Sequence, residues 1–123
     1  MYLTIKEYAE NSGIISDEEV LKKFLKKTEL YIDTLTYNRI KSIGFENCSD
    51  FEKAIITTVQ TELIDFYYSN QDMINSYLSS YSINGVNISL ANSNPNIFTI
   101  NGIPLLKSTY NKLCLTRFTS LIL

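Results

Sequence analysis

The sequence predicts a mainly α-helical protein: a small bundle of about four helices with a β-hairpin inserted before the C-terminal helix and an apolar C-terminal arm. Capping-box motifs precede apolar stretches, and the apolar residues in those stretches recur at three- and four-residue steps. Near residue 80 this period shortens to two, as in a strand. At 123 residues, 45% of them hydrophobic and 20% charged, the chain has the size and composition of one folded domain.

Residues 1–79 are predicted to form the helical bundle. TIKE at 4–7 and SDFE at 49–52 are capping boxes, in which the first side chain and a Glu three residues later cap each other's backbone. SDEE at 16–19 repeats the form, with acidic residues where the helix dipole favours them. We therefore expect a short helix over 5–12 and two longer helices that begin after the other two motifs.

The two longer helices are expected to bury one face each. In the first, apolar spacing marks Val20, Leu21, Phe24, Leu25, Thr28, Tyr31, Ile32 and Leu35, while the opposite face carries Lys22, Lys23, Lys26 and Lys27. In the second, the stripe is Ile55, Val59, Leu63 and Phe66, flanked by Phe51, Ile56 and Tyr67. SNQD at 69–72 interrupts this second helix, which we expect to be the most buried.

YSINGVNIS at 81–89 predicts the hairpin, within residues 80–90. The pair Asn84-Gly85 suits a type I′ turn, because both central residues of that turn take positive φ. One face of the ribbon is then apolar and the other polar. Since an isolated hairpin is marginal in water, the apolar face is expected to lie against the chain's own core or against a neighbouring molecule.

After the hairpin, residues 91–104 are predicted to be a loop. A second Asn-Gly pair at 101–102 weakly repeats the first, but Pro104 shortens any strand there. A last helix is expected over 105–115, with its buried side made by Leu106, Tyr110, Leu113 and Cys114. The remaining residues, 116–123, read TRFTSLIL and form an apolar terminus.

The sequence lacks the residues that several classes of catalytic and metal-binding site require. The sequence contains no His, which removes imidazole bases, Ser-His-Asp arrangements and His-ligated metals. Cys48 and Cys114 lie far apart, outside the spacing of a zinc site. We therefore expect no cofactor, no metal and no enzymatic activity.

The net charge and the hydropathy of the chain disfavour two kinds of partner, nucleic acids and membranes. The net charge of −2 gives no overall positive field, so wrapping of DNA or RNA is disfavoured. No apolar run approaches the ~20 residues of a membrane span, and the N-terminus lacks a signal-peptide core. We expect a soluble, unprocessed protein with no membrane association.

Two functions of other classes remain open. The first is a small helical regulator that binds nucleic acid through the lysine face at 22–27, although such a face is more often simply solvated. The second is an enzyme that uses the carboxylate of Glu62 or Asp65. The remaining acidic cluster, Asp17, Glu18 and Glu19, is better explained by the helix dipole.

Three stretches resemble one family, in the same order along the chain: LYIDTLTYNRI at 30–40, SYSINGVNISL at 80–90 and INGIPLLKSTYNKLCLTRF at 100–118. They are similar to the small head-tail connector proteins, also called adaptor or head-completion proteins, of long-tailed bacteriophages and related prophages. This resemblance implies a structural subunit that forms a ring, usually of twelve copies, on the portal protein. The ring would join the DNA-filled head to the tail in the virion neck, after assembly in the cytoplasm of the bacterial host.

The resemblance also implies partners and contact residues. The partners are the portal protein, neighbouring copies of the chain and the next neck or tail-completion protein, while DNA passes through without specific binding. By position, the portal-docking arm comprises Thr116, Arg117, Phe118, Leu121, Ile122 and Leu123. The projecting hairpin contact comprises Tyr81, Ile83, Asn84, Gly85, Val86 and Ile88. Related sequences often have Thr-Gly-Leu at 116–118, so no glycine fixes the direction of the arm here.

Overall fold

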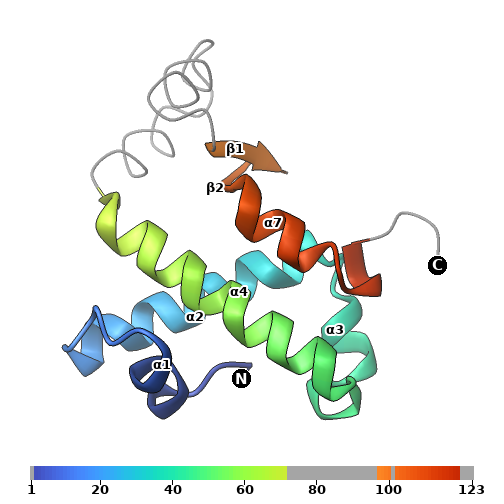
Figure 1. The fold of residues 1–123 in the computed structure, drawn as a ribbon, viewed down its shortest axis with the longest axis horizontal. Helices are drawn as coiled ribbons and strands as arrows, with labels where there is room; N and C mark the ends of the chain where they lie inside the picture. The colour runs from blue at the N-terminus through green and yellow to red at the C-terminus, as the bar shows by residue number, and fades with distance from the viewer. Residues whose placement is uncertain (1, 72–96, 101, 120–123) are drawn as a thin grey trace.

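The chain is mainly helical, with a small antiparallel hairpin ahead of the last helix, as the sequence predicts (Figure 1). The computed structural model describes residues 2–71, 97–100 and 102–119. The hairpin predicted at 80–90 lies outside these residues. The hairpin that the structure contains is a different one, closer to the C-terminus.

Two long helices, α2 (Glu18–Leu35) and α4 (Asp50–Ser69), form the framework, and α2 passes behind α4 in Figure 1. The other helices of the described residues are α1 (Ile5–Asn11), α3 (Arg39–Ile43) and α7 (Lys107–Leu113), with 3₁₀ turns η1 (Phe45–Asn47) and η2 (Arg117–Thr119). The strands are β1 (Ile97–Ile100) and β2 (Ile103–Leu106).

The capping motifs begin the helices nearly as predicted. Both capping boxes are present in full, at the start of α1 and at the start of α4. At α2 the prediction of a Ser16 cap is wrong by one residue. Asp17 caps that helix instead, because its carboxylate accepts hydrogen bonds from the backbone of Glu19 and Val20.

α2 and α4 pack through the predicted apolar faces. The side chains that they bury include Leu21, Leu25, Ile32 and Leu35 on α2 and Ile56, Val59, Leu63 and Ile64 on α4. Two predictions are corrected. Phe51 is 59% exposed, because the neighbouring Glu52 takes the inward position of that turn. Lys27 is half buried above the rings of Tyr31 and Tyr67, at 5.9 and 5.8 Å from their centroids, and does not share the exposed lysine face.

The loop predicted at 91–104 is wrong for 97–100 and 103–104, which belong to the strands β1 and β2, while residues 91–96 lie outside the described residues. The strands pair antiparallel from Ile97 opposite Leu106 to Ile100 opposite Ile103. Pro104 is tolerated because each strand of a two-stranded ribbon has a free edge, which needs no N–H donor. Gly102 has φ of +80°, the conformation that the tight connection requires. Tyr67 holds the ribbon on α4 by donating a 2.7 Å hydrogen bond to the Pro104 carbonyl.

The last helix is shorter than predicted, since residues 105 and 106 belong to β2 and α7 spans Lys107–Leu113. Of the residues predicted to be buried there, Leu113 is buried, Leu106 and Tyr110 are half buried and Cys114 is exposed. Tyr110 still packs against the main core.

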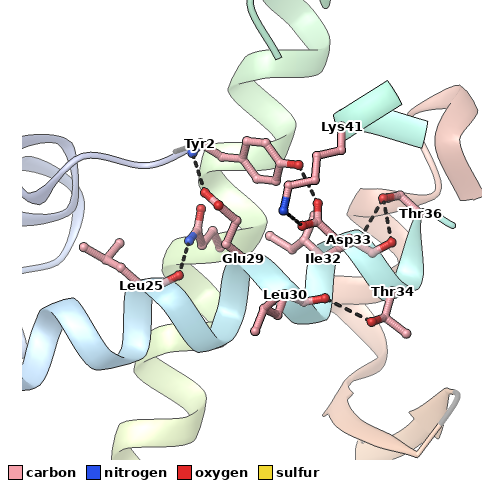
Figure 2. Close-up of polar contacts among 10 residues, drawn as sticks. Tyr2, Leu25, Glu29, Leu30, Ile32, Asp33, Thr34, Thr36 and Lys41 are labelled. Carbon is pink, nitrogen blue, oxygen red and sulfur yellow. Dashed lines mark hydrogen bonds and ion pairs between the residues drawn. The ribbon is translucent and has the colours of Figure 1, made fainter. Parts of the chain in front are cut away.

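A buried polar contact ties the N-terminal segment to α2 (Figure 2). The Tyr2 hydroxyl donates a hydrogen bond to the carboxylate of Asp33, whose other oxygen lies 3.0 Å from the ammonium of Lys41. The Tyr2 backbone N–H donates to Glu29 at 2.8 Å. Burial, and then the hydrogen bond to Asp33, raise the pKa of the Tyr2 phenol. The Tyr2 side chain also belongs to the main core, so the contact fixes the N-terminal segment against that core.

Candidate functional site

The outer face of α4 carries an open groove of about 490 Å³. Its lining residues are Glu62, Asp65, Phe66, Ser69, Asn70 and Leu106. Five of them follow the helical steps of three and four residues, so α4 and its C-cap Asn70 present them on one face. Phe66 and Leu106, the latter at the end of β2, are the apolar residues of the groove and make up its floor. The groove therefore combines two carboxylates with an apolar floor.

Asp65 joins this groove to α1. Its carboxylate accepts hydrogen bonds from the Tyr8 hydroxyl at 2.7 Å and the Ser12 hydroxyl at 2.6 Å. Burial and the Asp65 hydrogen bond raise the pKa of the Tyr8 phenol. Tyr8 also accepts a 3.1 Å hydrogen bond from the backbone of Ile15. Both hydroxyls are neutral donors, so they leave the negative charge of Asp65 uncompensated.

Glu62 joins the groove to α7. It accepts a 2.8 Å hydrogen bond from the Thr109 hydroxyl and forms an ion pair with Lys112. The structure thus brings together the two carboxylates that the sequence offered as an enzyme site. Asp65 holds α1 and Glu62 holds α7 against α4. These structural contacts explain the positions of both carboxylates without a catalytic role.

The C-terminal turn η2 is held by residues that lie far from it in the sequence. Arg117 pairs with Glu52 through Nε and Oε2 at 3.1 Å, and Arg39 donates from Nη1 to the Phe118 carbonyl at 3.0 Å. The Phe118 side chain is 1% exposed and belongs to the main core. We call these three interactions the C-terminal anchor. The anchor fixes the point from which residues 120–123 continue.

The anchored segment includes three residues of the predicted docking arm. Thr116 is buried and Phe118 is a core residue, so the chain stays packed through η2, while docking on the portal stays a prediction. Arg117 in this segment pairs with Glu52 of α4. The rest of the predicted arm, Leu121, Ile122 and Leu123, lies outside the described residues, as does the whole predicted hairpin contact.

The sequence predicts that Glu52 caps α4, but it does not predict that Glu52 also pairs with Arg117. Its Oε1 accepts from the Ser49 backbone while Oε2 holds Arg117, 65 residues away. The capping box marked only the local half of this arrangement. No local pattern links residues so far apart in sequence.

The lysine face of α2 remains exposed in part. Lys22, Lys23 and Lys26 are exposed, and within the described part of the chain no ion pair includes them. Leu30, one turn beyond Lys26, is also 54% exposed. The outer side of α2 is therefore a basic surface with one apolar side chain in it.

Among residues 2–71, 97–100 and 102–119, no three Cys, Asp or Glu side chains gather in a metal-binding arrangement. Over the same residues, none of the helices has both the length and the apolar character needed to span a membrane.

Comparison with known proteins adds no assignment: no family model, curated protein or solved structure matches this chain.

Proposed function

We propose that the chain is a structural subunit of a phage neck, forming a ring on the portal that joins the DNA-filled head to the tail. The resemblance of three ordered stretches to head-tail connectors is the starting point. The carrying observation from the structure is the C-terminal anchor, which would present residues 120–123, three of them apolar, from a rigid base.

A rigid base matters because a docking segment loses less conformational entropy when its start is already fixed. Arg117 and Arg39 hold η2 from two sides, and Phe118 seals it into the core. The residues that follow, Ser-Leu-Ile-Leu, are rich in apolar surface that a partner would cover. In this proposal the docking arm is therefore residues 120–123.

The test is co-sedimentation with the portal protein encoded in the same genetic element. We compare the full chain, a chain lacking residues 120–123, and a full-length variant with Leu121, Ile122 and Leu123 changed to Ala. Both changed forms should lose portal binding and keep their melting temperature, because Phe118 is retained. An Ile14→Ala variant, which removes an exposed apolar side chain elsewhere, is the matched control.

Equal binding by all forms would keep the connector function and move its contact to another surface. If the full chain does not bind the portal protein at any concentration tested, the connector proposal fails.

The second candidate is a nucleic-acid-binding regulator, favoured by the exposed Lys22, Lys23 and Lys26, which form no ion pair with any described residue. Phosphate contacts release counterions, so binding by such a regulator would weaken steeply with salt. A gel shift at rising salt separates the two functions. A connector is expected to bind DNA weakly at every salt concentration, and changing the three lysines to Ala should not alter this.

A further inference from the structure

We propose that copies of this chain associate head to tail, with the outer face of α2 in one copy docking into the α4 groove of the next. This inference rests on the proposed ring and names the two surfaces that would build it. The α2 surface comprises Lys22, Lys23, Lys26 and Leu30, and the groove comprises the six residues that line it.

The two surfaces lie on opposite sides of the subunit. Gln60 faces α2, since its amide donates to the Leu25 carbonyl at 3.0 Å. Glu62 is two residues further along α4, and a rotation of about 200° places it on the opposite side of that helix. On α2, the buried residues Leu21 and Leu25 face α4 while Lys23 and Lys26 face away. α2 and α4 thus separate the basic surface from the groove.

The charges of the two surfaces are complementary. The groove carries the Asp65 carboxylate, whose hydrogen bonds come from neutral hydroxyls. The α2 surface carries ammonium groups with no ion pair to any described residue. Each surface therefore has charge that the other would satisfy, which favours a second copy of this chain as the occupant.

The charged and apolar residues have the same axial spacing on the two surfaces. Leu30 lies four residues after Lys26, about 6 Å along α2, and Phe66 lies four residues after Glu62, about 6 Å along α4. Aligned side by side, the two helices would place Leu30 over the apolar floor made by Phe66 and Leu106 while a lysine reaches a carboxylate. An apolar anchor surrounded by charge pairs is the usual composition of an interface centre and rim.

Surfaces on opposite sides give a heterologous contact, which leaves each bound copy with one surface still free. Repetition of such a contact produces a closed ring when the rotation closes, and a filament when it does not. A two-fold dimer would instead use the same surface on both copies.

The test uses two variants of the full chain. Leu30→Asp with Lys26→Glu blocks the α2 surface, and Ser69→Arg blocks the groove. All three positions are exposed, so both variants are expected to fold. By sedimentation velocity, each variant alone should self-associate at least tenfold more weakly than the unchanged chain. Mixed together, they should form a one-to-one dimer, because each retains the surface that the other has lost.

Ile14→Asp with Lys6→Glu is the matched control, as it makes the same chemical changes at exposed positions on neither surface. It should self-associate as the unchanged chain does. The proposal is overturned if the two blocked variants associate normally, if their mixture does not dimerise, or if the unchanged chain stays monomeric at millimolar concentration. Portal binding by the blocked variants, measured separately, distinguishes failure of this interface from failure of the connector function.

Discussion

The side-chain amide of Gln60, in the middle of α4, donates a hydrogen bond to the backbone carbonyl of Leu25 on α2 at 3.0 Å. The same nitrogen lies 3.2 Å from the Thr28 hydroxyl oxygen. Among the described residues no donor reaches Oε1 of Gln60, although that oxygen is buried. The contact therefore joins the two long helices at one point while leaving an acceptor unsatisfied, which lowers its net stabilising effect.

Gln60→Met should change the free energy of unfolding by less than about 1 kcal/mol, because it keeps the volume and removes the unsatisfied oxygen together with the donor. Gln60→Ala leaves a cavity and should lower it by about 2–4 kcal/mol. Urea denaturation of both variants measures the difference. Equal losses for Met and Ala would show that the hydrogen bonds matter more than the volume.

Asp33→Ala should lower the free energy of unfolding by about 2–4 kcal/mol, because it leaves the buried hydroxyl of Tyr2 without an acceptor (Figure 2). Lys41→Ala should cost much less, since the Lys41 side chain is 58% exposed and solvent screens its pair with Asp33. Urea denaturation of the two single variants and of the double variant gives the coupling. A loss for Lys41→Ala as large as that for Asp33→Ala would contradict this account.

The turn between α2 and α3 holds two consecutive non-glycine residues at positive φ, Tyr37 at 56° and Asn38 at 59°. Asn tolerates this conformation better than most residues, and a β-branched residue tolerates it poorly. Asn38→Gly should therefore be neutral or stabilising by up to about 1 kcal/mol. Asn38→Val should destabilise by about 1–3 kcal/mol. The melting temperatures of both variants, measured by thermal unfolding, test this prediction. A higher melting temperature for Asn38→Val than for the unchanged chain would show that the turn rearranges.

The fold class and the starts of α1 and α4 could be predicted, and the start of α2 to within one residue, because their signals are local. Ser49 and Glu52 lie three residues apart, and the apolar steps from Leu21 to Leu35 lie within one helix. The pairing of β1 with β2 was missed, because Pro104 disfavours strands in general and only the free edges of this ribbon permit it.

The candidate site was harder to predict from the sequence, because it is assembled from distant segments. Glu62 and Asp65 were singled out, but Thr109, Lys112 and Tyr8, which hold them, come from helices elsewhere in the chain. Phe118 looked like part of an exposed arm because apolar residues continue after it to the terminus. Its side chain instead belongs to the main core, and its backbone carbonyl accepts a hydrogen bond from Arg39, which no spacing rule connects to it.

Tyr67 should make the protein sensitive to alkaline pH. Burial, and then the nearby Tyr31, raise the pKa of the Tyr67 phenol above its ordinary value of 10.0. Above pH 10 the unfolded chain therefore releases this proton while the folded chain keeps it, so the stabilisation is complete below pH 10 and declines as pH rises. The slope for one such group is about 1.4 kcal/mol per pH unit.

Tyr67→Phe should lower stability at neutral pH by about 1 kcal/mol, because it removes the hydrogen bond to the Pro104 carbonyl. It should also flatten the decline in the free energy of unfolding between about pH 10 and 11, since Phe has no proton to release. Tyr37→Phe, at a side chain that is 48% exposed, is the matched control and should leave the decline unchanged. Urea denaturation across this range measures both effects, and an unaltered slope in Tyr67→Phe would assign the alkaline sensitivity to other groups.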